Sequence, residues 1–425
     1  MNLQKSQDAF NSWKQISFTE RQKLFLKFAE ILKDRSEDFG KIITSEMNKP
    51  ISQAISEIKK CAKMMEFYGT SENTLEKKVI ESDFGISEVY REPMGVILGI
   101  MPWNYPFWQA LRFAVPTILA GNVVVMKHAS ICEKTGDTLQ KLFKEAGFPD
   151  YVFTHLKISH DAIKILLEDP ILKAVSLTGS ETAGSSVAAN AGKNIKKSVL
   201  ELGGNDAFIV LDDANLDEAA KSAALGRLQN CGQTCVAAKR FIIQSSIYEE
   251  FMKKFIAEFK TYKVGNPMEK DTKIAGMARA DLSLDLEKQY QNALENGAEI
   301  IVPLERIDEI SFKPGLIKMK VGNPVLDEEL FGPLGMVLEA ETDAEILELA
   351  NNTKFGLANA VWSTDKNRLN FFMNGLQSGT VSINQLTKSD TRFPFGGTKN
   401  SGYGIELSLE ALKEFTTTKT VLGNF

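Results

Sequence analysis

Apolar side chains follow a helical spacing at the start of the chain and an alternating spacing further on. Phe10, Trp13 and Leu24 belong to the first pattern, which extends over about seventy residues and predicts amphipathic helices. Between Val79 and Pro93, apolar and polar residues alternate around Asp83-Phe84-Gly85. This second pattern predicts a β-hairpin.

Beyond Pro93, short apolar segments alternate with helical patterns. The segments that predict strands are Val96–Ile100, Val123–Met126, Ala174–Leu177, Ser198–Leu202, Ala207–Leu211, Phe241–Gln244, Val337-Leu338, Ala360-Val361 and Thr380–Ile383. Because most are continuously apolar and separated by helices, they predict parallel sheets covered on both faces, an α/β fold. A length of 425 residues exceeds what one core usually supports, and we place the boundary between two α/β units at Gly203-Gly204.

Composition argues against several classes of function. The chain is 43% hydrophobic, has a net charge of −5 and contains no block of lysine or arginine, so nucleic-acid and anionic-membrane binding lack electrostatic support. No stretch approaches the ~20 apolar residues of a membrane span, and the polar start lacks the apolar core of a signal peptide. Four irregularly spaced cysteines favour a reducing cytoplasm, and three histidines without zinc-ligand spacing predict no metal site.

Cys235 has the most reactive surroundings of the four cysteines. It ends the loop sequence Gln229-Asn-Cys-Gly-Gln-Thr-Cys235, downstream of a strand that ends Leu200-Glu201-Leu202. A thiol that attacks a carbonyl and a carboxylate that activates water together equip a site for covalent catalysis. Taken singly, Cys235 also fits a small buried hydrophobe, and Glu201 also fits a solvent-facing or ion-paired side chain.

Three turns join a predicted strand to a predicted helix and carry polar residues. Asn104 can donate to an oxyanion or cap the next helix, and Lys127 can bind a nucleotide or remain a solvated charge. Gly179-Ser180 opens a helix whose free N–H groups suit a pyrophosphate, although the Gly-x-Gly-x-x-Gly fingerprint occurs nowhere in the chain. Since parallel sheets bind ligands at the carboxyl ends of their strands, the three turns together favour a nucleotide site.

Six motifs in order resemble the aldehyde dehydrogenase superfamily, from about residue 10 to the C-terminus. They are Pro102-Trp103-Asn104, the strand ending in Lys127, Thr178-Gly179-Ser180 with Gly184, Leu200-Glu201-Leu202-Gly203-Gly204, Gly232-Gln-x-Cys235, and Glu329-x-Phe331-Gly-Pro followed by Pro394-Phe395-Gly396-Gly397. This resemblance implies a nucleophile at Cys235, a general base at Glu201, and an oxyanion hole made by Asn104 and the Cys235 backbone N–H. It also implies NAD or NADP bound by Trp103, Asn104, Lys127, His128, Ala129, Ser130, Gly179, Ser180, Gly184, Leu202, Glu329 and Phe331.

The resemblance also implies how the chain is divided. Residues 1–77 and 95–203 are expected to form a variant Rossmann domain that binds the cofactor. Residues 204–398 are expected to form a catalytic domain, and residues 78–94 with 410–425 a bridging sheet used in oligomerisation. A homodimer or homotetramer is therefore expected.

The segment Met101–Arg112 is most similar to succinate-semialdehyde dehydrogenases of this superfamily. Arg112 matches an arginine that binds the distant carboxylate of the substrate, a task suited to the two parallel hydrogen bonds of a guanidinium; a helix-surface arginine is the alternative. The resemblance thus implies oxidation of succinate semialdehyde to succinate through a thiohemiacetal and a thioester on Cys235. Another short aldehyde, capture of the thioester by coenzyme A, and a non-catalytic scaffold are the alternatives.

Four positions depart from the family pattern. Gln229 replaces a second carboxylate-binding arginine, which weakens the semialdehyde assignment. Ser130 replaces a glutamate that repels the 2′-phosphate of NADP, which admits NADP as the cofactor. Cys231 stands at a usual threonine position and Ile405 at a usual arginine position.

Overall fold

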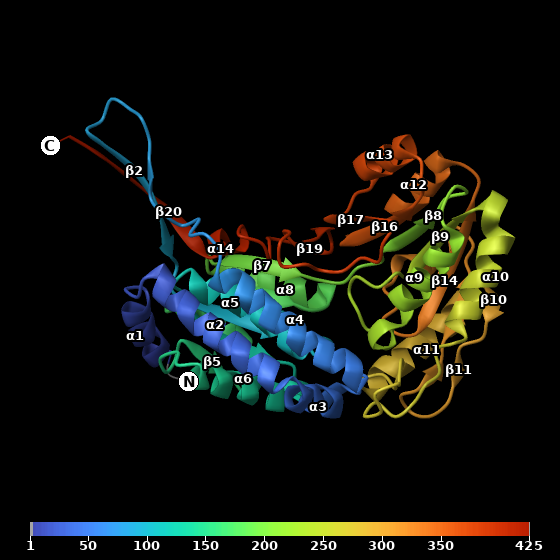
Figure 1. The fold of residues 1–425 in the computed structure, drawn as a ribbon, viewed down its shortest axis with the longest axis horizontal. Coiled ribbons are helices and arrows are strands. Elements are labelled where there is room, and N and C mark those ends of the chain that lie inside the picture. Colours follow the sequence, from blue (N-terminus) through green and yellow to red (C-terminus); the bar gives the residue numbers. More distant parts are fainter. Residues whose placement is uncertain (1–2, 425) are drawn as a thin grey trace.

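The structure, a computed structural model, describes residues 3–424, and most of its strands belong to two large sheets. Figure 1 shows two bodies, one built mainly from the first half of the chain with the C-terminal segment lying against it, and one built from the second half, with a thin arm projecting from the first body. The sheets are largely parallel and carry helices between their strands. The predicted α/β fold class is therefore confirmed.

The first sheet has six strands and is parallel except at one edge. In spatial order they are β19 (Gly402–Tyr403), β7 (Lys197–Glu201), β6 (Leu172–Thr178), β3 (Val96–Met101), β4 (Val123–His128) and β5 (Phe153–His155). β19 pairs with β7 in the antiparallel sense, and the remaining pairs are parallel. The four apolar runs predicted between Val96 and Leu202 all form strands of this sheet, while β5 and β19 are additional.

Helices from the first half of the chain surround this sheet. They are α1 (Gln4–Trp13), α2 (Phe18–Asp34), α3 (Ser36–Met47), α4 (Ile51–Gly69), α5 (Pro106–Leu119), α6 (Glu133–Glu145), α7 (His160–Glu168) and α8 (Glu181–Lys193). Every residue of α5 is buried, because α5 packs against β3 and β4 on one side and α4 on the other (Figure 1). Across residues 3–424, no helix has the length and apolarity needed to span a membrane.

The second sheet has seven strands and its own hydrophobic core. In spatial order they are β10 (Glu299–Val302), β13 (Gly315–Lys318), β14 (Leu334–Ala340), β9 (Arg240–Gln244), β8 (Ala207–Val210), β16 (Ala358–Trp362) and β17 (Thr380–Ile383). Its helices are α9 (Leu216–Leu228), α10 (Tyr248–Phe259), α11 (Ala280–Glu295), α12 (Asp343–Asn351) and α13 (Lys366–Gly375). Only the pairing of β10 with β13 is antiparallel within this sheet.

A third, three-stranded sheet forms the arm that leaves the first body in Figure 1. It consists of β1 (Lys78–Val79), β2 (Ile86–Pro93) and β20 (Thr416–Gly423), all antiparallel. The hairpin predicted between Val79 and Pro93 is thereby confirmed. Shorter elements are β11 (Glu305–Arg306), β12 (Phe312–Lys313), β15 (Phe355–Gly356), β18 (Thr398–Lys399) and α14 (Ala411–Glu414). The domain limits and the oligomerisation role of the arm stay predictions.

Candidate active site

The carboxyl ends of neighbouring strands bring the predicted turns to one edge of the first sheet. Met101 at the end of β3 is paired with His128 at the end of β4, and Thr178 at the end of β6 is paired with Glu201 at the end of β7. The turns that follow these strands contain residues 102–105, 129–130 and 179–180. Ligands of open parallel sheets bind at this edge, where backbone groups are left unpaired.

The loop before Cys235 bends sharply through three consecutive left-handed residues. Asn230, Cys231 and Gly232 have φ values of 53°, 55° and 74°. Asparagine tolerates this region better than most residues, and at position 232 a side chain would overlap the carbonyl of Gly332. The order Asn-Cys-Gly therefore suits a tight turn that leads from α9 back toward the first sheet.

Amide hydrogen bonds tie this loop to the turn after β3. The Nδ2 of Asn230 donates to the carbonyl oxygens of Asn104 at 2.9 Å and Gln233 at 3.1 Å. The Nδ2 of Asn104 also donates to the Gln233 carbonyl, at 3.0 Å. Asn104 and the loop that carries Cys235 are consequently held together by neutral groups that are almost fully buried.

A buried lysine fixes the backbone on the other side of the loop. The Nζ of Lys239 donates to the carbonyl oxygens of Thr234 at 3.1 Å and Cys235 at 2.6 Å. The same ammonium lies 3.0 Å from the Glu329 carboxylate, which also accepts from the Gly204 N–H. With its backbone carbonyl anchored, Cys235 has little freedom to move away from the strand ends.

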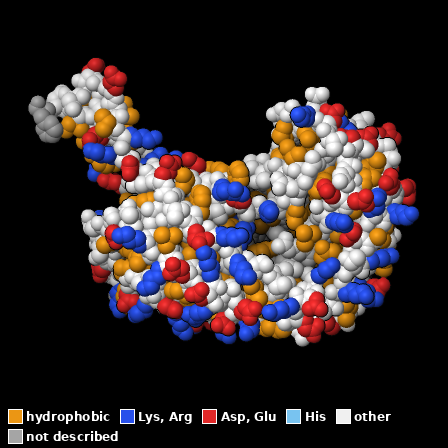
Figure 2. Space-filling model, in the orientation of Figure 1, with side chains coloured by type: hydrophobic (Ala, Val, Ile, Leu, Met, Phe, Trp, Pro, Cys, Tyr) orange, Lys and Arg blue, Asp and Glu red, His pale blue; other side chains and the backbone are white. Residues whose placement is uncertain are grey.

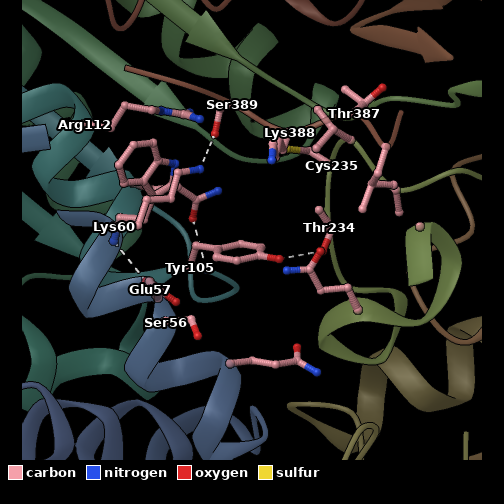
Figure 3. Close-up of a pocket in the computed structure, with 18 of the residues that line it drawn as sticks. Ser56, Glu57, Lys60, Tyr105, Arg112, Thr234, Cys235, Thr387, Lys388 and Ser389 are labelled. Carbon is pink, nitrogen blue, oxygen red and sulfur yellow. Dashed lines mark hydrogen bonds between the residues drawn. The ribbon is translucent and has the colours of Figure 1, made fainter. Parts of the chain in front are cut away.

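Cys235 lines two cavities at once. One has a volume of about 310 Å³ and contains Arg112, Tyr105, Lys60 and Ser389 in its wall (Figure 3). The other, of about 240 Å³, is lined by Trp103, Asn104, Thr178, Gly179, Ser180, Leu202, Gly203, Glu329 and Phe331. In Figure 2 the molecule is hollowed between the two bodies. A half-buried thiol between two cavities can meet a different small molecule on each side.

The thiol is held in its protonated form at neutral pH. Burial raises the pKa of Cys235 to about 11, although the positive charges of Arg112 and Lys239 act in the opposite direction. The negative charges of Glu329 and Glu201 add to the increase. Attack on a carbonyl therefore requires a proton acceptor or a local change that favours the thiolate.

Three charged side chains form a buried cluster in which Arg112 is in the wall of the larger cavity, while Glu201 and Glu406 are in the wall of neither cavity. Arg112 on α5 makes an ion pair with Glu406, and both side chains are almost completely buried. Glu201 is 2% exposed, and its Oε1 has no hydrogen-bond partner among the described residues. Burial raises the pKa of Glu201 well above its ordinary value, Arg112 opposes this increase, and the charge of Glu406 adds to it.

Most of the predicted cofactor residues line the smaller cavity, but Gly184 and residues 127–130 do not. Trp103, Asn104, Gly179, Ser180, Leu202, Glu329 and Phe331 are in its wall. Gly184 instead lies against Leu202, where a β-carbon would come within 2.7 Å of that side chain. Lys127, His128, Ala129 and Ser130 lie at the end of β4, next to β3 and outside the wall of this cavity.

His128 is occupied by structural hydrogen bonds. Its Nε2 lies 2.9 Å from the Pro106 carbonyl oxygen, and its Nδ1 accepts from the Ala129 N–H at 2.9 Å. Burial lowers the pKa of His128 to about 4, so the ring is neutral at physiological pH. Ser130, by contrast, is exposed and free to meet a ligand at the edge of the sheet.

Several residues that shape the site were not singled out from the sequence. They are Lys60, Asn230, Gln233, Lys239 and Glu406. Asn230 and Gln233 stand in the same loop motif as Cys235, and an asparagine before Cys-Gly is a signal for a left-handed turn. Glu406 follows Ile405 in a segment that resembles the family pattern, whereas Lys60 has no comparable local signal, because its partner is distant in the chain.

Comparisons with known proteins agree on one family. The family model described as "Aldehyde dehydrogenase family" matches residues 1–421. A probable succinate-semialdehyde dehydrogenase (NADP(+)) of Synechocystis sp. is 40% identical over 423 residues, which cover 99% of this chain and 93% of the relative. Succinate-semialdehyde dehydrogenase (NADP(+)) 1 of Mycobacterium tuberculosis is 39% identical, with 97% and 92% covered.

A solved structure of the same kind of enzyme also matches this chain. The succinic semialdehyde dehydrogenase of Streptococcus pyogenes, crystallised with NADP+ as the cofactor, superposes with a TM-score of 0.96 at 34% identity. The match covers 100% of this chain and 94% of that one. On these matches and on the site that the strand ends assemble, the chain belongs to the aldehyde dehydrogenase family.

Proposed function

We propose that this protein oxidises succinate semialdehyde to succinate with NADP, through a covalent intermediate on Cys235. The observation that carries the proposal is the position of Cys235 between two cavities, one with cationic side chains and one with a glycine-serine turn at a helix start. The Synechocystis and Mycobacterium relatives are named for this substrate and cofactor, and the Streptococcus structure holds NADP+. The family membership supplies the reaction class.

Cys235 is the proposed nucleophile. The thiol first gives up its proton to water in the cavity; the sulfur then adds to the aldehyde carbon, and the carbonyl oxygen becomes an oxyanion in a thiohemiacetal. Loss of a hydride from that carbon restores the C=O bond and leaves a thioester. When bound, the nicotinamide ring of the cofactor accepts this hydride. Water then attacks the thioester, and the sulfur leaves as the acid is released.

Asn104 and the Cys235 backbone N–H are the proposed oxyanion hole. Asn104 is buried, and one Nδ2 hydrogen is directed to the Gln233 carbonyl, which fixes the amide and leaves the second hydrogen free to donate. A fixed donor stabilises developing charge without reorganising during the reaction. The hydrogen bond from Asn230 to the Asn104 carbonyl holds this residue from the other side.

Glu201 is the proposed general base for hydrolysis of the thioester. A carboxyl group with a raised pKa can accept a proton from water more strongly than an ordinary glutamate. Its unpartnered Oε1 leaves a position for that proton. The same feature favours water over coenzyme A as the group that captures the thioester, because coenzyme A brings its own nucleophilic sulfur.

The residues of the smaller cavity fit a dinucleotide. Ser180 caps α8 by accepting from the Ala183 N–H, and Gly179 precedes it at a helix start that suits a pyrophosphate. The Trp103 and Phe331 rings lie edge to face at 5.7 Å and offer apolar walls to a flat ring. We assign Lys127 and the exposed Ser130 to the ribose and its 2′-phosphate, since no carboxylate stands at position 130 to repel NADP.

We also propose a homo-oligomer in the cytoplasm. The arm of β1, β2 and β20 projects from the body, and its apolar Val79, Ile80 and Leu422 are exposed, as expected for a surface that another copy covers. Light scattering on the purified protein tests for a dimer or tetramer. A catalytic thiol needs a reducing compartment, and cell fractionation tests that location.

The activity is tested by following absorbance at about 340 nm, where reduced nicotinamides absorb, with NAD or NADP and either succinate semialdehyde or butanal. We expect the highest kcat/KM with succinate semialdehyde and NADP. Equal values for both aldehydes contradict the substrate assignment, and absence of turnover with every pair contradicts the function. Mass spectrometry of an acid-quenched reaction should detect the acyl group on Cys235.

A further inference from the structure

Lys60 is a half-buried lysine whose ammonium faces the larger cavity. It lies on α4, and its Nζ donates to the hydroxyl of Ser389 at 2.8 Å (Figure 3). The same Nζ lies 3.9 Å from the centre of the Trp108 ring, which is an attractive position for a cation. The aromatic ring and the hydroxyl thus fix the ammonium in the wall that also contains Arg112.

Within the described residues, Lys60 has no ion-pair partner. The nearest carboxylate along α4, Glu57, is taken by Lys49 and by the backbone N–H groups of Phe107 and Trp108 at the start of α5. Asp390, beside Ser389, accepts from the Nε and Nη2 of Arg392 at 2.9 and 2.7 Å. Burying a cation without an anion raises the free energy of the unliganded protein. Binding of an anionic ligand removes this unfavourable contribution.

The charges in the cavity wall leave an excess of positive charge. Arg112 is matched by its ion pair with Glu406, whereas Lys60 has no anion within the described residues; Lys388, in the same wall, is exposed, so water screens its charge. Arg112 also keeps a buried Nη2 without a hydrogen-bond partner. Gln229, in the same wall, is neutral. The cavity that contains Cys235 therefore suits a small molecule with a carboxylate at the end opposite its aldehyde.

We propose that Lys60, oriented by Ser389 and Trp108, is a specificity-determining residue that binds the distal carboxylate of the substrate together with Arg112. The inference rests on the proposed oxidation of a semialdehyde and assigns a second cation to its recognition. Because Gln229 supplies no charge, the ammonium on α4 provides the second positive charge in this wall beside Arg112.

Lys60 should also make recognition depend on pH. Burial and the nearby charge of Arg112 lower the pKa of Lys60 to about 8 in the absence of a ligand. Glu57 on its own helix and Asp390 favour the cation; the other titratable groups around it are Cys61, whose pKa is raised by burial so that the thiol is neutral near pH 8, and Lys388 in the same wall. Below about pH 8 the ammonium is charged and can bind a carboxylate; above it, the neutral amine binds weakly.

The test compares Lys60→Met with Lys388→Met, a matched change of an exposed lysine in the same cavity. The readout is the ratio of kcat/KM for succinate semialdehyde to kcat/KM for butanal, with NADP. Because Lys60→Met removes a charge-assisted hydrogen bond to the carboxylate, we expect this ratio to fall about 10- to 100-fold. In Lys388→Met it should change at most about threefold, as for exposed charges.

The pH dependence of the same ratio gives an independent readout. Ionisations of Cys235 and Glu201 affect both aldehydes and cancel in the ratio. For the unaltered protein the ratio should be constant below about pH 8 and decline above it. In Lys60→Met the ratio should not change with pH. In Lys60→Arg the decline near pH 8 should disappear, while the preference for the charged aldehyde remains.

Two outcomes overturn the role of Lys60 without affecting the proposed function. One is a preference for succinate semialdehyde that is unchanged in Lys60→Met. The other is a loss of this preference in Lys388→Met as large as that in Lys60→Met, which indicates that the positive charges of the cavity attract the carboxylate without a specific contact. If the unaltered protein oxidises butanal and succinate semialdehyde equally well, the substrate assignment fails and the Lys60 proposal fails with it. Circular dichroism and thermal unfolding confirm that each variant is folded.

Discussion

The two sides of Cys235 are built by opposite means. On one side, neutral amides hold the loop of residues 229–235 to the turn after β3, with Asn230 bonded to both Asn104 and Gln233, and Lys239 anchors the last carbonyls of the loop. On the other side, Arg112, Glu201 and Glu406 form a charged cluster in which buried carboxyl oxygens lack hydrogen-bond partners among the described residues. Both regions are buried, but only the first has its polar groups largely satisfied.

This difference matches two different tasks. A satisfied network of neutral hydrogen bonds is rigid, and rigidity is what holds a nucleophile and an oxyanion donor at one distance. A carboxylate that accepts several N–H groups has a low pKa and is a poor base, whereas a buried and incompletely paired carboxyl has a raised pKa. The incomplete hydrogen bonding of Glu201 therefore lowers the stability of the folded protein. It also raises the pKa of this carboxyl group, which suits proton transfer.

The largest expected effect comes from removing the sulfur. Cys235→Ala should lower kcat by at least about 10⁴-fold, because no other group in the two cavities can form the thioester. The free energy of unfolding should change by less than about 1 kcal/mol, since the side chain is small and half-buried. Steady-state rates and chemical denaturation measure the two quantities. Retention of activity would remove Cys235 from its role.

Changing the base should slow one half of the reaction only. Glu201→Gln keeps the shape of the side chain and removes its ability to accept a proton, so hydrolysis of the thioester should slow about 10²- to 10⁴-fold. Formation of the acyl group should remain faster than its hydrolysis. A rapid burst of reduced cofactor followed by slow turnover checks this expectation. A steady rate equal to that of the unaltered protein would contradict it.

The sequence allowed the charged and neutral regions to be predicted to different extents. Cys235, Glu201 and Asn104 could be predicted as site residues because each stands in a local motif at a strand end or in a loop. The pairing of Arg112 with Glu406 and that of Lys60 with Ser389 were not found, because the latter two are 329 positions apart and only the fold joins them. Hydrophobic periodicity says nothing about such pairs.

The same reasoning applies to the fold. The predicted strands were short, mostly apolar segments, and eight of the nine became interior strands of the two sheets, while Thr380–Ile383 became the edge strand β17. The edge strand β19 was missed because Gly402-Tyr403 has no apolar run and is defined only by its pairing with Glu201 and Leu200. This short strand places the segment that carries Glu406 next to the strand that carries Glu201, so the charged cluster depends on tertiary structure.

The rigidity of the neutral side is tested at Asn230. Asn230→Ala removes two hydrogen bonds and also strains a backbone with φ of 53°. We expect kcat to fall about 10- to 100-fold and the free energy of unfolding to fall by about 2–4 kcal/mol. Asn230→Gly is the matched control, because glycine accepts this φ but cannot make the hydrogen bonds.

Comparison of the two variants separates orientation from strain. If hydrogen bonding positions Asn104, Asn230→Gly should lose nearly as much activity as Asn230→Ala while recovering part of the stability. Crystal structures or acyl-enzyme formation rates of both variants then report on the oxyanion hole. Full activity in Asn230→Gly would show that the neutral network is not needed to hold the site.

The smallest effect, and the sharpest test of the charged side, is expected from Glu406→Gln. The charge of Glu406 raises the pKa of Glu201, and Arg112 lowers it, so removing the first charge leaves Arg112 free to favour ionised Glu201. Ionised Glu201 is the form that accepts a proton, so hydrolysis of the thioester should persist to lower pH. The acidic limb of the rate profile should therefore shift downward, with less than about a tenfold change in rate near neutrality. Glu410→Gln, an exposed change on the same segment, should leave the profile in place, and a shift to higher pH in Glu406→Gln would contradict the assigned coupling.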